Sequence, residues 1–292
     1  MGVWTGGSSE SWFDYDKLSR YRLLVNPETH SKIESGSKTF YLISVDVGRL
    51  SCQTVVTVFK VNPREDGYFC NVVNIYVIGR TEETKHFERQ ALDLKKIIAA
   101  FEPREVVIDG NGLGVGLLDF MAKPTIDTDG VVYPAYCPFN DDDYKAFRTK
   151  DSINNVYCIK ANSTLNSQIH SHCYTKIFSG RVKFLIKEQE AKNRLLSTKV
   201  GQKLSVDSRI MRLMPHEMTT KLFEEMANLR LKKTGNGMDI NLEQINTRYL
   251  KDKFSSLEYG LWRIKEIEEE EKKSWRKRAN ATRKLVFYTR GG

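Results

Sequence analysis

The stretch Phe40-Tyr41-Leu42-Ile43-Ser44-Val45-Asp46-Val47-Gly48 decides how the chain is organised. Its apolar run, rich in β-branched and aromatic residues, predicts a buried strand. A single carboxylate, Asp46, comes near the end of that strand, and burying an unpaired carboxylate costs free energy. We therefore expect Asp46 to be paired, hydrogen-bonded or bound to a metal. Gly48 follows where the backbone turns or approaches another group closely.

A second stretch, Glu105-Val106-Val107-Ile108-Asp109-Gly110-Asn111-Gly112, repeats the pattern of an apolar strand that ends in Asp and Gly. An amphipathic helical pattern over residues 81–101 precedes it, and a helix between two strands predicts a crossover that makes them parallel. Parallel neighbours bring their carboxyl ends to one edge of a sheet. A turn hydrogen bond explains each aspartate alone, but together Asp46 and Asp109 favour a metal site.

The whole pattern predicts an α/β domain with a mixed central sheet of about five or more strands flanked by helices. The first three strands are expected to form an antiparallel meander, and a later strand is short or at an edge because it contains Pro134. The strands are expected at residues 40–46, 53–61, 68–78, 105–109, 131–136 and 181–186. The helices are expected at residues 81–101, 114–121, 167–178, 187–197, 216–231 and 250–271.

Three segments divide the chain. Residues 1–38 lack a clean period and are expected to be a lead or linker that packs on the domain. Residues 39–271 are expected to form the domain itself, and residues 272–292 a basic C-terminal tail. The aromatic-rich beginning is typical of the middle of a larger protein.

The composition is typical of a globular protein and favours a polyanionic binding partner. Hydrophobic residues are 40% and charged residues 28% of the chain, an ordinary balance for a soluble domain. No apolar run approaches the roughly 18 residues of a membrane span, and no signal peptide begins the chain, so we expect no membrane partner and no secretion. The net charge of +9 favours an anionic partner such as nucleic acid. An odd number of cysteines without C-x-x-C pairs predicts free thiols in a reducing compartment.

A third acid is expected from the last helix. Asp252 opens this helix, where a helix N-cap explains an aspartate as well as a metal site does. On a continued helix, Asp252 would point away from the apolar stripe that begins at Leu250. The residues therefore leave Asp239, Glu243 and Glu258 open as alternatives.

The order of three strands, a helix, a strand and a helix, with acids on the first and fourth strands, resembles the ribonuclease H-like fold. In that fold the two acid-bearing strands lie side by side, and a third acid arrives from a late helix. Such carboxylates hold two divalent cations roughly 3.5–4 Å apart, which activate water and stabilise the leaving oxygen of a phosphodiester. Hard oxygen ligands favour Mg²⁺ or Mn²⁺.

Residues 43–48, 107–112 and 251–260 resemble the acid motifs of the nuclease domain of tailed-bacteriophage terminase large subunits, and the likeness extends over nearly the whole chain. The resemblance implies a metal-dependent endonuclease that cleaves double-stranded DNA during viral genome packaging in the host cell cytoplasm. It makes Asp46, Asp109 and Asp252 the catalytic metal ligands, with two Mg²⁺ or Mn²⁺ ions as cofactors. It also implies an ATPase motor domain, a small terminase subunit and the portal of the procapsid as partners.

The sequence departs from that family in two places. Some relatives carry a second acid just after the first motif or a histidine near the third, whereas Gly48 and Tyr249 stand here, so a fourth ligand stays open. The phosphate loop G-x-x-x-x-G-K-[ST] of the motor is missing, because no Lys-Ser/Thr follows the alternating glycines from Gly110 to Gly116. We therefore expect the nuclease part alone, unable to translocate DNA.

Candidate DNA contacts are basic residues near the acids or on a loop, although solvated surface charge explains each of them as well: Arg49, Arg148, Lys150, Lys251 and Lys253. His170 and His172 are not expected to be ligands. Two other functions stay open. One is a ribonuclease H-like nuclease of the resolvase or transposase type, and the other is a non-catalytic basic module that binds DNA or capsid.

Overall fold

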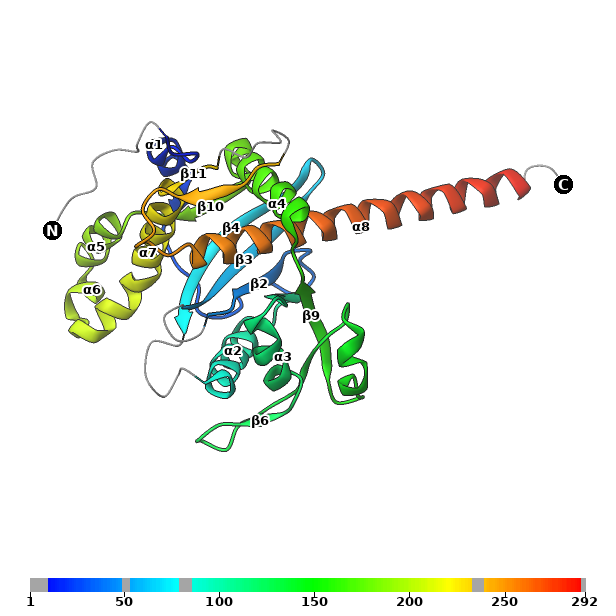
Figure 1. Cartoon of the computed structure of the whole chain (residues 1–292), viewed down its shortest axis with the longest axis horizontal. Helices are drawn as coiled ribbons and strands as arrows, with labels where there is room; N and C mark the ends of the chain where they lie inside the picture. Colours follow the sequence, from blue (N-terminus) through cyan, green and yellow to red (C-terminus); the bar gives the residue numbers. More distant parts are fainter. Residues whose placement is uncertain (1–9, 49–52, 79–85, 233–238, 290–292) are drawn as a thin grey trace.

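A computed structural model of the chain describes residues 10–48, 53–78, 86–232 and 239–289, with side chains up to Lys277 in the last range. Its centre is a mixed sheet of eight strands in the order β1-β10-β4-β3-β2-β5-β9-β8 (Figure 1). The strands are β1 (Arg22–Leu24), β2 (Phe40–Asp46), β3 (Thr54–Arg64), β4 (Gly67–Ile78), β5 (Glu105–Asp109), β8 (Tyr136–Pro138), β9 (Ile153–Ile159) and β10 (Val182–Leu185). The predicted α/β class with a mixed central sheet is confirmed.

The five central strands, β4-β3-β2-β5-β9, have the order of the ribonuclease H-like fold. The strands β2, β3 and β4 form the predicted antiparallel meander, in which Asp46 pairs with Val55. The strand β5 lies parallel to β2, with Val45 beside Ile108, as the helical crossover predicted. The sheet is completed by β9 parallel to β5, and by β10 parallel to both β4 and β1.

The sequence missed one central strand and misplaced another. No strand was expected at β9, because Asn154 and Asn155 shorten its apolar run to four residues, Val156 to Ile159. The strand expected at residues 131–136 is split at Pro134, which cannot donate a ladder hydrogen bond. Before the proline, β7 (Val132–Tyr133) pairs with β6 (Thr125–Ile126) in a separate hairpin, and after it β8 begins at the sheet edge.

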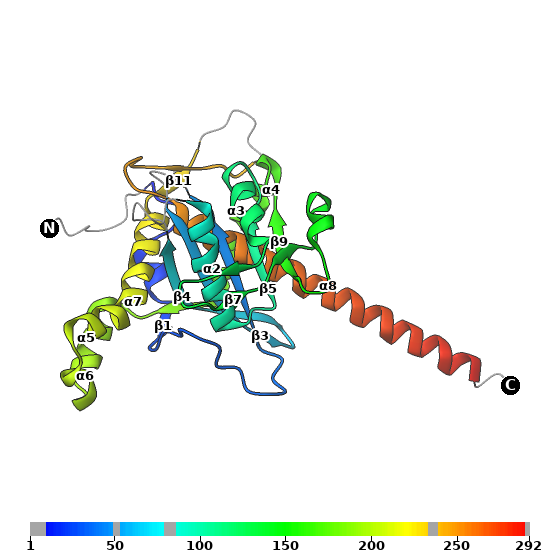
Figure 2. The ribbon, with the colours of Figure 1, turned by 90° about the horizontal axis from the view of Figure 1, so that it is seen from below.

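Helices cover both faces of the sheet (Figures 1 and 2). Successive side chains of β2 point to opposite faces and so pack against different helices. Tyr41, Ile43 and Val45 pack toward α2 (Phe87–Phe101) and α3 (Leu113–Met121). Phe40 and Leu42 pack into the opposite core. That core is formed with α4 (Ser163–Lys176), α7 (Val206–Ala227) and α8 (Asp252–Thr289). Alternation therefore turns the Asp46 side chain toward the layer that contains α8.

Smaller elements complete the chain. They are α1 (Tyr15–Ser19), the 3₁₀ helix η2 (Asp142–Phe147), the π-turn η3 (Ile177–Arg181), α5 (Glu188–Leu196), α6 (Lys199–Lys203), β11 (Leu229–Leu231) and β12 (Leu242–Gln244). In the N-terminal segment, Phe13 and Leu18 are fully buried in the core beneath α8. The helix predicted at residues 216–231 begins earlier, at Val206, and its last three residues form β11. The predicted start of α2 at Thr81 lies outside the described residues.

Two general features agree with the sequence. Four cysteines, Cys70, Cys137, Cys158 and Cys173, are buried free thiols, and Cys52 lies outside the described residues. None of the described helices combines the length and the apolar character that a membrane span requires.

The helix α8 crosses the sheet in very close contact with β2 and β3. The Ser256 hydroxyl lies 2.8 Å from the Ser44 carbonyl oxygen and 2.8 Å from Thr57 Oγ1. One turn later, a Cβ atom on Gly260 would lie 2.3 Å from the Phe59 ring and 2.9 Å from Ser44 Cβ. Only glycine allows the helix to approach so closely.

Replacing Gly260 with alanine should therefore lower the free energy of unfolding, although alanine is the better helix former. The added methyl group must displace Phe59 or the helix itself, and overpacking of this kind costs roughly 1–3 kcal/mol. Urea unfolding of the full chain measures the effect. Ser274→Ala, on the exposed part of the same helix, is the matched control and should change little. Equal stabilities of Gly260→Ala and the parent would contradict this packing.

The far end of α8 leaves the body of the molecule. The predicted helix end at residue 271 is wrong, because the helix runs on to Thr289. Every described side chain from Glu269 to Lys277 is exposed. Figures 1 and 2 both show this part of the helix extending away from the sheet.

Candidate functional site

Asp46 and Asp109 lie side by side at the carboxyl ends of two parallel strands. Since Val45 is in register with Ile108, the two aspartates are the next residues along β2 and β5, which are roughly 4.8 Å apart. Both face the α8 layer, because Leu42 on β2 and Val107 on β5 belong to the core on that side. The structure thus brings together the carboxylate pair that the two strand motifs predicted.

Asp252 reaches the same edge of the sheet from the first turn of α8. Its Oδ2 atom accepts a hydrogen bond from the backbone N–H of Gln53 (3.2 Å). Gln53 stands two residues before Val55, which pairs with Asp46. A contact with the neighbouring strand therefore fixes the direction of the Asp252 side chain, which helix periodicity had left open.

The electrostatics of the site show that Asp252 and Asp109 both act on Asp46. The pKa of Asp46 is raised well above its usual value, first by burial and then by the charges of Asp252 and Asp109, while the ammonium of Lys251 opposes the shift. Burial also raises the pKa of Asp109 and of Asp252. Backbone donors oppose both shifts, with Asn111 N–H bonded to Asp109 Oδ1 at 3.0 Å. The free site therefore disfavours its own negative charge.

This donor set fits a divalent cation in its chemistry. All three side chains are half-buried oxygen ligands, and a cation would offset their mutual repulsion. Among the described residues, no three His, Cys, Asp or Glu side chains already stand close enough to enclose a metal ion. The three carboxylates nevertheless share one edge of the sheet.

The alternative third acids have different surroundings. Glu258 is buried on α8, its Oε2 atom lies 2.6 Å from His170 Nδ1, and its charge also raises the pKa of Asp46. Glu243 pairs with Arg230 across the β11–β12 ribbon. Asp239 is exposed. Of the alternatives to Asp252, Glu258 alone is shown to influence Asp46.

The N-terminus of α8 is held by Glu225 of α7. Its Oε2 atom accepts hydrogen bonds from the backbone N–H groups of Lys253 (2.8 Å) and Phe254 (3.1 Å). Its Oε1 atom binds the Lys253 ammonium (2.7 Å). Burial raises the pKa of Glu225 to about 7, although Lys253 and the Phe254 N–H oppose the shift. Glu225 thus acts as a helix cap supplied from another element, beside Asp252.

The basic residues predicted to contact DNA have different surroundings in the structure. Lys253 is wrong as a phosphate contact, because its side chain is 4% exposed and paired with Glu225. Arg148 donates from Nε to the Pro138 carbonyl (2.8 Å) and from a terminal nitrogen to that of Asp141, so it holds its own loop. Lys150 and Lys251 are exposed, and Lys251 adjoins the acids. Arg49 lies outside the described residues.

Sequence reasoning missed two groups that shape the site. Glu225 is 28 residues before Lys253, and His170 is 88 residues before Glu258, so no local pattern links either pair. His170, which the sequence does not predict to be a metal ligand, contacts the Glu258 carboxylate of α8. The only sequence signal for Glu225 is an acid within an apolar stretch of a helix, Leu222 to Ala227.

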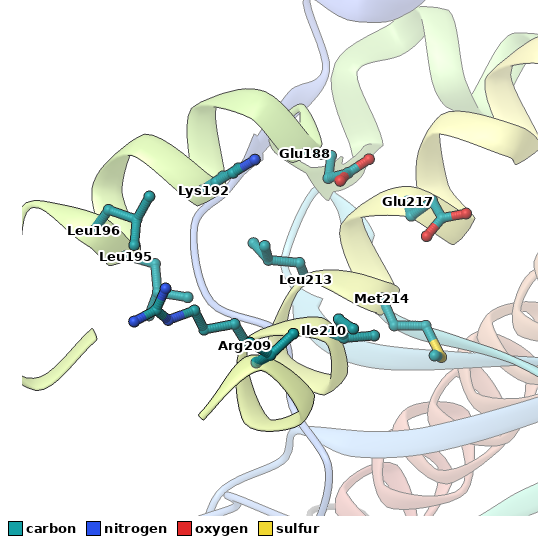
Figure 3. Close-up of a pocket in the computed structure, with 10 residues that line it drawn as sticks. Glu188, Lys192, Leu195, Leu196, Arg209, Ile210, Leu213, Met214 and Glu217 are labelled. Atoms are coloured by element: carbon teal, nitrogen blue, oxygen red, sulfur yellow. The ribbon is translucent and has the colours of Figure 1, made fainter. Parts of the chain in front are cut away.

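Two cavities lie apart from the acids. One, of about 280 Å³, lies between α5 and α7, with walls that include Leu195, Ile210 and Met214 (Figure 3). The other, of about 330 Å³, lies between α4 and α8 and includes Lys176 and Lys265. Neither wall contains any of the three aspartates.

No protein-family model matches the chain, and a search of curated proteins finds no match. Among solved structures, the large terminase nuclease from thermophilic phage G20c, with bound magnesium, superposes with a TM-score of 0.50 at 15% identity. The alignment covers 87% of this chain and 97% of that one. The chain has the fold of a large-terminase nuclease domain. The resemblance inferred from three short acid motifs is confirmed at the level of the fold.

Other terminase structures also align with this terminase-nuclease fold, but less closely. The g2p nuclease domain of bacteriophage SPP1, with bound Mn, gives a TM-score of 0.37 at 11% identity over 82% of this chain and 96% of that one. The HK97 bacteriophage large terminase gives 0.43 at 9% identity, with 86% of this chain and 43% of that one covered.

Proposed function

We propose that the chain is the nuclease of a large terminase, a metal-dependent endonuclease that cleaves double-stranded DNA during viral genome packaging in the host cytoplasm. The observation that carries the proposal is the convergence of Asp46, Asp109 and Asp252 on one face and one edge of the sheet. The terminase-nuclease fold supports it, and the similar G20c nuclease was solved with bound magnesium.

Asp46, Asp109 and Asp252 would hold two Mg²⁺ or Mn²⁺ ions, which supply an activated water and stabilise the leaving oxygen of the phosphodiester. The chain's own groups prepare this site. The N–H groups of Asn111 and Gln53 orient the Asp109 and Asp252 carboxylates.

Lys251, which is exposed and acts electrostatically on Asp46, would bind a DNA phosphate and help to set the register of the duplex. By resemblance, the proposed partners are an ATPase motor domain, a small terminase subunit and the portal of the procapsid.

Plasmid cleavage by the full chain in Mg²⁺, Mn²⁺ or EDTA tests the proposal. We expect metal-dependent nicking and linearisation, reduced at least about 100-fold in Asp252→Asn, because even outer-shell changes cost roughly 10–100-fold. Glu258→Gln retains a hydrogen-bonding side chain against His170 and should lose less.

The opposite order of the two variants would make Glu258 the third acid. No cleavage by the parent with any metal would contradict the enzyme and favour a binding module. A strong preference for branched over linear duplex would favour a resolvase.

A further inference from the structure

Residues 272–289 of α8, called here the basic arm, form a helix whose described side chains do not pack on the body. Its side chains from Lys272 to Lys277 are all exposed, including Trp275 at 71%. The sequence of the arm contains no Asp or Glu, and its basic residues are Lys272, Lys273, Arg276, Lys277, Arg278, Arg283 and Lys284. The arm is therefore a concentrated positive charge held away from the sheet (Figures 1 and 2).

The acidic run that precedes the arm is engaged with other groups. Glu270 pairs with Arg263 (2.8 Å) and Glu271 with Arg104 (2.5 Å). Glu268 pairs with Lys176 of α4 and with Lys272. Among the residues whose side chains are described, Lys273, Arg276 and Lys277 have no acidic partner. Glu268 and Glu271 therefore anchor the helix to the body, while the charges of Lys273, Arg276 and Lys277 stay unbalanced.

The helical arm is destabilised by its own charge. Lys272 and Arg276 stand one turn apart, as do Lys273 and Lys277, and like charges at this spacing destabilise a helix. Its described part has no tertiary packing, which supplies most of the stability of helices in proteins. A partner with negative charges in a row would both bind the arm and stabilise its helix.

We propose that the basic arm binds the phosphate backbone of duplex DNA outside the acid site. At roughly 1.5 Å per residue the arm is about 27 Å long, which spans about eight base pairs at roughly 3.4 Å each. The arm also has an apolar run at its far end, Leu285-Val286-Phe287-Tyr288. In its nearer part, from Lys272 to Lys277, one large apolar side chain, Trp275, stands among four basic residues, and this composition favours a polyanion over an apolar protein interface there. The choice of DNA as the polyanion rests on the proposed function, but the binding itself does not require cleavage.

The test measures binding of the full chain to a short fluorescent duplex by anisotropy, in EDTA, across roughly 50–200 mM salt. The variant Lys273→Gln/Arg276→Gln/Lys277→Gln removes three charges and keeps good helix formers. The matched control Lys187→Gln/Lys199→Gln/Lys203→Gln removes three exposed charges near α5 and α6, at the opposite end of the molecule (Figure 1).

We expect the arm variant to bind about tenfold or more weakly. The slope of log K against log salt should fall by about 2 to 3, and the control should match the parent. Equal affinity and slope in the arm variant and the parent would overturn the proposal, as would an equal loss in the control. Arm-dependent binding of polyglutamate without arm-dependent binding of duplex would assign the arm to an acidic protein instead. Because EDTA prevents cleavage, a chain that fails to cut DNA can still bind it through the arm.

Discussion

Asp46→Asn should abolish metal-dependent cleavage and, in EDTA, make the fold more stable than the parent. Without metal, the Asp46 carboxylate is desolvated and repelled by Asp252 and Asp109, so its neutral isostere removes an unfavourable charge. On the proposed function, the same carboxylate would become a ligand when metal is present. The parent should then gain roughly 2.7 kcal/mol at a metal concentration 100 times Kd, and the variant should gain much less.

Melting temperatures of both proteins with EDTA and with Mn²⁺, beside the cleavage assay, measure this reversal. Activity should fall at least about 100-fold. Asp143→Asn, which neutralises an exposed aspartate of η2, is the matched control and should leave both quantities unchanged. An Asp46→Asn protein that is less stable than the parent in EDTA would show that the carboxylate stabilises the fold without metal, contrary to this account.

In EDTA, the difference in stability between Asp46→Asn and the parent should depend on pH with a definite sign. A carboxyl group whose folded pKa lies above its unfolded pKa makes the folded state bind more protons, so its contribution to stability is lost as pH rises through the folded value. The stability advantage of Asp46→Asn over the parent should therefore be small near pH 4 and grow toward neutral pH. Urea unfolding at several pH values measures it.

Glu225→Ala should cost about 3–5 kcal/mol of folding free energy, the range for breaking a buried ion pair on one side. The change leaves the Lys253 ammonium buried without its partner and removes the acceptor for two N–H groups of α8. Glu225→Gln keeps an acceptor and should cost less. It should nevertheless reduce cleavage, because small displacements of catalytic groups reduce rates by as much as about 100-fold.

The neighbouring Glu224→Ala, a half-exposed site on the same helix, is the matched control and should stay within about 0.5 kcal/mol of the parent. The double variant Glu225→Leu/Lys253→Met should recover much of the loss, since apolar replacement of a buried pair is often neutral. Chemical denaturation of all four variants measures the series. A Glu225→Ala protein as stable as its Glu224→Ala control would refute the capping role.

Most of the central sheet was predictable because its strands have clear local sequence patterns. The run ending at Asp46, the meander that follows and the helical crossover to Asp109 each carry a clear period, and crossover chirality fixes the parallel pairing. The strand β9 was not predictable in the same way. Its two asparagines mask the apolar run, and only its place beside β5 makes it a strand.

The site was predictable where a strand carries it and less so where a helix does. Register alone places Asp46 beside Asp109, whereas the direction of Asp252 depends on the Gln53 N–H and on the cap from Glu225. Lys253 shows the same limit. As a lysine beside an acid motif it was a reasonable phosphate contact, and only the tertiary fold reveals its buried partner.

The strand order also governs when this chain can fold during synthesis. The hairpins β2–β3 and β3–β4 join strands that are adjacent in the chain and can form early. By contrast, β1 can pair only after β10 has been made, because Arg22 of β1 and Leu185 of β10 are 163 residues apart. The helix α8, which covers Leu42 and Phe59, is made after every strand. A chain still attached to the ribosome therefore lacks the helix that covers this apolar face of the sheet. It also lacks Asp252, so the acid site is completed only after the strands have been synthesised.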